Sequence, residues 1–93
     1  MQFDWDNGNA AKCTKHGLTL NWIEAFFRLG PLVAPDPMHS VQEQRFIAAG
    51  SMPDGRPAFV AFCWRGAKIR PISARYMHAR EARRYENRPN SDH

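Results

Sequence analysis

Residues 45–74 read RFIAAGSMPDGRPAFVAFCWRGAKIRPISA, and this stretch contains three runs that favour β-strands. The first run covers residues 45–51, and a Pro-Asp-Gly turn separates it from the second run at 58–64. The third run, at 68–74, follows a tight connection at Gly66. Connections this short join antiparallel neighbours. The stretch therefore predicts a β-meander, with the run at 58–64 in the centre because it is apolar on both faces.

Prolines limit where the outer strands can lie. Pro71 interrupts the third run, and because proline donates no backbone hydrogen bond, we expect this strand to lie at an edge or to contain a bulge. Residues 32–34 lie between prolines and predict at most a short edge strand. Residues 36–40 then form a polar loop, and residues 3–5, which alternate apolar and polar, predict a brief first strand.

Two helices are predicted between the first strand and residues 32–34. Asp6 is a suitable N-cap for a short helix that runs to His16, with Gly17 as its stop. A second helix starts near Thr19 and ends at Gly30, and its apolar residues recur at the spacing of one helix face.

A third helix follows the meander, at about residues 78–86, and ends before Arg88 and Pro89. The element order is therefore β-α-α-β-β-β-β-α. This order predicts an α+β domain in which the helices pack on an antiparallel sheet.

The length and composition are those of one small globular domain. The chain has 93 residues, of which 43% are hydrophobic and 24% charged. We expect a single domain at residues 1–88 and a polar C-terminal tail at 89–93. The net charge is +4, and residues 65–93 contain eight of the 13 basic residues, seven of them Arg, against three of the nine acidic ones. This excess points to a polyanion such as nucleic acid, but it does not distinguish binding from catalysis.

Several classes of protein are excluded by the same sequence. No apolar run approaches the roughly 20 residues that a membrane-spanning helix needs. The first residues, MQFDWDNGN, are polar and acidic, unlike those of a signal peptide. Cys13 and Cys63 form no disulfide framework, and we expect reduced thiols in a cytoplasmic protein.

Five collinear motifs resemble the BrnT family, the toxin half of a bacterial type II toxin–antitoxin pair. They are WDxGN at 5–9, KHG at 15–17, DPxHSxxExRFIAxG at 36–50, GRPxFVAF at 55–62 and IRPISARYMHxxE at 69–81. The resemblance implies a compact fold similar to the RelE-type ribonucleases, metal-free RNA cleavage that inhibits translation, and no cofactor. It also implies a BrnA-like antitoxin with a ribbon-helix-helix domain, bound as a dimer in a heterotetramer.

A set of titratable and cationic side chains matches the chemistry of metal-free RNA cleavage. Such cleavage needs a base for the 2′-hydroxyl proton, cations that stabilise the phosphorane, and an acid for the leaving 5′-oxygen. Arg65 and Arg75 end neighbouring strands, so we expect their guanidinium groups to converge on one phosphate. The candidate catalytic residues are Lys15, His16, His39, Glu43, Arg65 and Arg75. The candidate RNA-binding residues are Lys12, Lys68, Arg70, Tyr76 and Arg80.

Most of these residues also have a purely structural interpretation. His16 can cap a helix end and His39 can form a hydrogen bond within its loop. Glu43 can form a surface ion pair with Arg45, two residues away. The arginines of the last helix can belong to a solvated face, and Tyr76 can be buried. A module of the same fold that binds nucleic acid or protein without catalysis is therefore the alternative function.

A zinc site is a further alternative. Cys13 and His16 have the spacing of a ligand pair, and Cys63 and His39 would complete a set of four. Structural zinc sites usually comprise two close pairs, and only one is present here. We therefore expect no metal.

Overall fold

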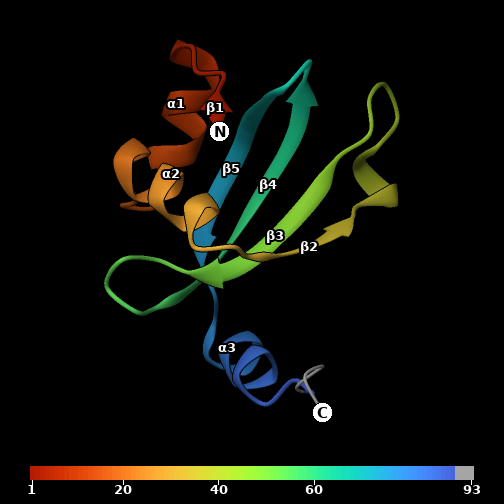
Figure 1. The fold of residues 1–93 in the computed structure, drawn as a ribbon. Helices are drawn as coiled ribbons and strands as arrows, with labels where there is room; N and C mark the ends of the chain where they lie inside the picture. The colour runs from red at the N-terminus through yellow and green to blue at the C-terminus, as the bar shows by residue number, and fades with distance from the viewer. Residues whose placement is uncertain (90–93) are drawn as a thin grey trace.

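Nine segments of regular structure follow one another in the computed structural model, which describes residues 1–89 (Figure 1). They are β1 (Gln2–Phe3), α1 (Asn7–Thr14), α2 (Leu20–Arg28), β2 (Leu32–Pro35), the 3₁₀ turn η1 (Pro37–His39), β3 (Phe46–Ser51), β4 (Pro57–Arg65), β5 (Lys68–Tyr76) and α3 (Ala79–Glu86). The order is the predicted one, with η1 added in the polar loop. Apart from Pro89, the predicted polar tail lies outside the described residues. None of the helices in residues 1–89 is long and apolar enough to span a bilayer.

The five strands form one sheet in the order β1-β5-β4-β3-β2. The apolar strand β4 is central and β2 lies at an edge, which confirms both predictions. Strands β2 to β5 are antiparallel to their neighbours, but β1 runs parallel to β5. The sheet is therefore mixed, and the prediction of a wholly antiparallel sheet is wrong at β1. Because β1 pairs with a strand near the other end of the chain, no hairpin turn sets its direction.

Strand β5 lies inside the sheet, and of the two predictions for Pro71 the structure confirms the bulge. Ala61 pairs with Ser73 and the next residue of β4 pairs with Pro71, so Ile72 has no partner on β4. The Pro71 carbonyl accepts a hydrogen bond from Asn9 Nδ2 at 2.8 Å, on the side away from β4. Strand β1 pairs only with the first residues of β5, so the missing N–H interrupts no ladder on that side.

Side-chain caps start α1 and α2, as predicted. Asp6 accepts hydrogen bonds from two backbone N–H groups of the first turn of α1, and the Thr19 hydroxyl does so once for α2. Helix α1 ends at Thr14 and not at His16, because Gly17, at a φ of 89°, closes a turn onto the Thr14 carbonyl at 3.2 Å. Consequently His16 belongs to the connection between the helices.

Helices α1 and α2 cover one face of the sheet and form the core with it (Figure 1). Phe27 of α2 packs edge-to-face against Phe26 at 5.3 Å and against Phe62 of β4 at 5.1 Å between ring centroids. Cys13 and Ile23 are fully buried in the same cluster. No helix of residues 1–89 covers the opposite face, which we call the open face.

Candidate active site on the open face

The pairing of β3, β4 and β5 places side chains on the open face in rows, because cross-strand partners point to the same side of a sheet. Successive rows are two residues apart, or about 6.5 Å. From the α3 end of the sheet to the β4–β5 turn, the rows comprise Ala49 with Phe59 and Arg75; Ile47 with Ala61 and Ser73; Cys63 with Arg70; and Arg65 with Lys68. The open face therefore carries small or apolar side chains in the row of Ile47, Ala61 and Ser73, and it is cationic in the two rows nearest the β4–β5 turn.

A pocket of about 240 Å³, which we call the basic pocket, lies at the cationic end of this face. It is lined by Gly8, Asn9, Lys12, Glu43, Arg45, Arg65, Arg70 and Ile72. Four cationic side chains thus surround one carboxylate, an arrangement that attracts a phosphate group. Lys12, Glu43, Arg65 and Arg70 were predicted from the sequence as site residues, and the structure brings them together.

Two of the four cations are held by carboxylates. Arg65 Nη2 bonds to Glu43 Oε1 at 3.1 Å, so the predicted Glu43–Arg45 ion pair is wrong. A hydrogen bond with the Cys63 thiol, and after it the bond with Glu43, raises the pKa of Arg65. Arg70 bonds to Asp6 at 2.9 Å and to Asp4 at 3.2 Å, and these bonds, that with Asp6 first, raise its pKa as well.

The other two cations of the basic pocket are available to a ligand. Among residues 1–89, no ion pair includes the side chain of Lys12 or Arg45. Arg45 was not predicted as a site residue. The alternation Arg45, Ile47, Ala49 could have placed it on the open face, since residues two apart in a strand point the same way.

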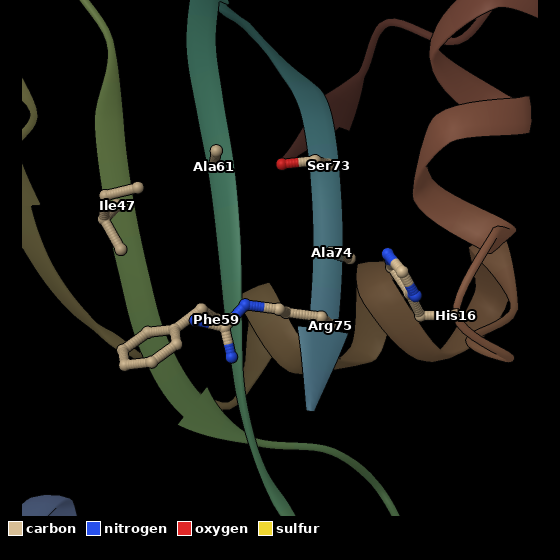
Figure 2. Close-up of a pocket in the computed structure, with 7 residues that line it drawn as sticks. All are labelled: His16, Ile47, Phe59, Ala61, Ser73, Ala74 and Arg75. Atoms are coloured by element: carbon tan, nitrogen blue, oxygen red, sulfur yellow. The ribbon is translucent and has the colours of Figure 1, made fainter. Parts of the chain in front are cut away.

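A second pocket, of about 340 Å³, lies over the first two rows, nearest the α3 end, and we call it the His16 pocket (Figure 2). It is lined by His16, Ile47, Phe59, Ala61, Ser73, Ala74 and Arg75. His16 approaches it from the outer side of β5, and Arg75 extends from β5 toward Phe59. Lys12 of α1 lines the basic pocket, and His16, in the connection just after α1, lines the His16 pocket. The structure therefore brings two of the predicted site residues, His16 and Arg75, to the same pocket.

Arg75 is oriented by α3. Its Nη1 and Nη2 donate to the two carboxylate oxygens of Glu81 at 2.8 and 2.9 Å, and its guanidinium carbon lies 5.2 Å from the centroid of the Phe59 ring. The hydrogen bond from Arg75, together with one from the His78 backbone, lowers the pKa of Glu81 to about 2. None of the residues of α3 is buried, so this bidentate pair is a principal link between α3 and the sheet.

The lowered pKa of Glu81 predicts that α3 loosens in acid. A carboxylate whose folded-state pKa lies below the ordinary 4.5 stabilises the fold above that pH and loses its effect as the pH falls toward about 2. We expect the amides of α3 to exchange hydrogen faster as the pH falls through this window. In the Glu81→Gln variant, the same amides should exchange fast already at neutral pH. Glu86→Gln, at an exposed position of the same helix, is the control. Equal acceleration in both variants would show that the Arg75–Glu81 pair does not hold α3.

Arg65 and Arg75 do not converge, which corrects the prediction that they bind one phosphate. Arg65 pairs with Lys68 at the start of β5, whereas Arg75 pairs with Phe59 at the start of β4. Along β4 the two pairs are six positions apart, about 20 Å. In an antiparallel pair, the end of one strand lies beside the beginning of the other. The end of β4 with Arg65 and the end of β5 with Arg75 therefore lie at opposite ends of the open face.

His39 and Tyr76 have the contacts that their structural interpretations predicted. His39 Nδ1 bonds to Asp36 Oδ2 at 2.9 Å, and its side chain is 66% exposed in the loop before β3. The Tyr76 ring packs against the core, and Arg56 covers it at 3.6 Å from the centroid. One face of that ring is thus closed to a base.

The remaining predicted residues lie on the surface around the two pockets. Lys15 is exposed after α1, and Lys68 is exposed beside Arg65. Arg80 is exposed on α3 in a groove shared with other arginines, and no ion pair within residues 1–89 includes it. Neither the basic pocket nor the His16 pocket is lined by Lys15, Lys68 or Arg80.

The four ligands of the hypothetical zinc site do not come together. Within residues 1–89, no three His, Cys, Asp or Glu side chains are close enough to hold a metal ion. Cys13 is buried in the core, where burial raises its pKa to about 11. Cys63 is also buried, but the row pairing places it on the opposite side of the sheet. Both thiols are free.

Comparison with known proteins agrees with the geometry. No curated protein sequence matches the chain significantly. The family model of BrnT, the ribonuclease toxin of a type II toxin–antitoxin system, matches residues 5–81. This match covers most of the chain and contains every residue of both open-face pockets. The chain therefore belongs to the BrnT family of ribonuclease toxins.

Proposed function

We propose that this toxin is an endoribonuclease that cleaves RNA on the open face without a metal ion. The observation that carries the proposal is the basic pocket, in which four cations surround Glu43 in about 240 Å³. Lys12 and Arg45 are free to stabilise the negative charge that develops on the phosphorane. This is the role that a metal ion has in other nucleases.

The proposed cleavage uses one residue from each open-face pocket: Glu43 of the basic pocket and His16 of the pocket beside it. The 2′-oxygen attacks the adjacent phosphorus while its proton passes to the Glu43 carboxylate. The bond from phosphorus to the 5′-oxygen then breaks, and the 5′-oxygen takes a proton from His16. Histidine suits this step because its imidazole exchanges protons near neutral pH. The products are a 2′,3′-cyclic phosphate and a free 5′-hydroxyl.

The arginines that already bond to carboxylates have a supporting role in this scheme. Arg65 orients the Glu43 carboxylate through its 3.1 Å bond. Arg70, held by Asp4 and Asp6, forms the wall of the pocket beside α1. These bonds fix the side chains before RNA arrives, so binding does not have to order them.

Purified toxin should cleave RNA in the presence of EDTA and leave 2′,3′-cyclic phosphate ends. Mass spectrometry of the RNA fragments identifies these ends. Binding of RNA to the toxin should also weaken steeply as the salt concentration rises, because binding releases counterions from the RNA. Loss of cleavage on chelation that added Mg²⁺ restores would refute the metal-free mechanism. Salt-sensitive binding without cleavage would instead identify a non-catalytic RNA-binding module.

We also propose that a BrnA-like antitoxin with a ribbon-helix-helix domain neutralises the toxin in the cytoplasm. Type II toxins are silenced by a protein partner, and the family match is the support for this proposal. A heterotetramer of two toxins and an antitoxin dimer is the expected assembly. Co-expression with the product of the neighbouring gene, followed by light scattering, measures the partner and the stoichiometry.

A further inference from the structure

The His16 pocket differs in character from the basic pocket beside it. Its floor is apolar, formed by Ile47 of β3 and Ala61 of β4, and the Phe59 ring closes one end (Figure 2). Its polar groups, His16, Ser73 and Arg75, lie at the rim or on the β5 side. An apolar floor with a few polar groups suits a flat, partly apolar ligand better than a phosphate.

We propose that the His16 pocket binds one unstacked nucleobase of the RNA, a purine in preference to a pyrimidine. This inference rests on the proposed function, because the base belongs to the strand whose phosphate occupies the basic pocket. Proteins that read single-stranded RNA stack bases on aromatic rings and guanidinium planes and bond to the edges of the base. Phe59 and Arg75 provide the planar groups.

The width of the pocket favours a base with two rings. The floor spans β3, β4 and β5, whose axes are about 4.8 Å apart, so Ile47 and Ser73 are separated by about 10 Å. At the far side of this floor, the exposed Ser73 hydroxyl has no hydrogen-bond partner within residues 1–89 and is free to bond to the edge of a base.

The Arg75–Glu81 pair prepares the pocket for such a ligand. Both terminal nitrogens of Arg75 are bonded to Glu81, so the guanidinium presents its plane, and not its terminal donors, beside Phe59. A side chain that is already ordered loses little conformational freedom when a base stacks on it. The bidentate pair thereby gives α3 a positioning role at the site.

Binding of nucleotides that cannot be cleaved tests the base pocket separately from catalysis. NMR titration of the whole protein with AMP, GMP, UMP and ribose 5-phosphate compares ligands that share a phosphate but differ in the base. We expect the purine nucleotides to bind about tenfold more tightly than ribose 5-phosphate, the effect of one stacked base. The largest shifts should fall on Phe59, Ala61 and Ser73.

Variants of one strand locate the effect. Ala61→Leu fills the floor without removing a group, and should reduce purine affinity to that of ribose 5-phosphate. Trp64→Ala is the control, because it removes a 50% exposed aromatic side chain from the helix-covered side of β4 and should leave binding unchanged. A thermal melt of each variant confirms folding.

The outcomes separate this inference from the proposed function. Equal affinity for AMP and ribose 5-phosphate, or unchanged purine binding by Ala61→Leu, overturns the base pocket even if RNA is cleaved. A pyrimidine preference overturns the assignment to purines. Purine binding that Ala61→Leu abolishes, in a protein that never cleaves RNA, supports the pocket and refutes the nuclease proposal.

Discussion

Replacing Glu43 by glutamine should reduce the rate of RNA cleavage by about 10²- to 10⁴-fold, the usual effect of losing one proton-transfer group. Glutamine has the same shape and keeps an oxygen that accepts the bond from Arg65, so the basic pocket should remain folded. The variant cannot take the 2′-hydroxyl proton, however. Single-turnover cleavage of a short RNA measures the rate, and binding of the same RNA should stay within about twofold or become tighter, because a negative charge has been removed.

Glu86→Gln is the matched control, since it removes an exposed carboxylate far from the basic pocket. It should cleave at the rate of the unsubstituted toxin. If Glu43→Gln also retains full activity, the carboxylate is not the base. Comparison of His16→Ala with His39→Ala would then show which imidazole takes the proton, because His39 and Glu43 line a common hollow with Arg45.

Replacing Asn9 by alanine should destabilise the domain by roughly 2–5 kcal/mol, because it leaves one buried and two partly buried backbone groups without their side-chain partner. Asn9 is the one buried polar residue of the described chain and is 5% exposed. Its Oδ1 accepts from the Asp6 N–H at 2.7 Å, and its Nδ2 donates to the carbonyls of Asp4 and Pro71 at 2.9 and 2.8 Å. Urea unfolding measures the loss, which is a large fraction of the stability of a domain this size.

The Asn9 side chain also fastens α1 to β5 and thereby positions Lys12 and His16. We therefore expect Asn9→Ala to cleave RNA more slowly than the unsubstituted toxin even at temperatures where it remains folded. Asn7→Ala, an exposed substitution in the same helical turn, should change the free energy of unfolding by less than about 0.5 kcal/mol. Equal stability of the two variants would show that apolar packing alone holds α1 on the sheet.

Local chemistry explains why most of the fold was predictable. The caps at Asp6 and Thr19, the Pro-Asp-Gly turn and the continuous apolar run of β4 each act within a few residues, and each is found where it was predicted. The end of α1 was wrong by two residues, because a single hydrogen bond from Gly17 to Thr14 decides it. A residue pattern does not predict which single hydrogen bond forms at the end of a helix.

Contacts between distant segments explain what was missed in the fold. The parallel direction of β1 and the interior place of β5 both depend on the N-terminal segment, which reaches a strand more than 60 residues away. Pro71 allowed an edge or a bulge, and the choice followed from where β1 stops and where Asn9 reaches the Pro71 carbonyl.

The candidate site also has features that the sequence predicts and features that depend on contacts between distant segments. The sequence by itself determined the element order, the family and the types of residue that the chemistry requires, because caps, turns, alternation and motif letters are local properties of the chain. Only the tertiary structure decided which of these residues meet. It joined Arg45 to the basic pocket, separated Arg65 from Arg75, and fastened Arg75 to Glu81. The physical reason is that strand pairing, antiparallel within the meander and parallel at β1, brings together residues that are far apart in the sequence. Their separation along the chain therefore does not predict their distance in space.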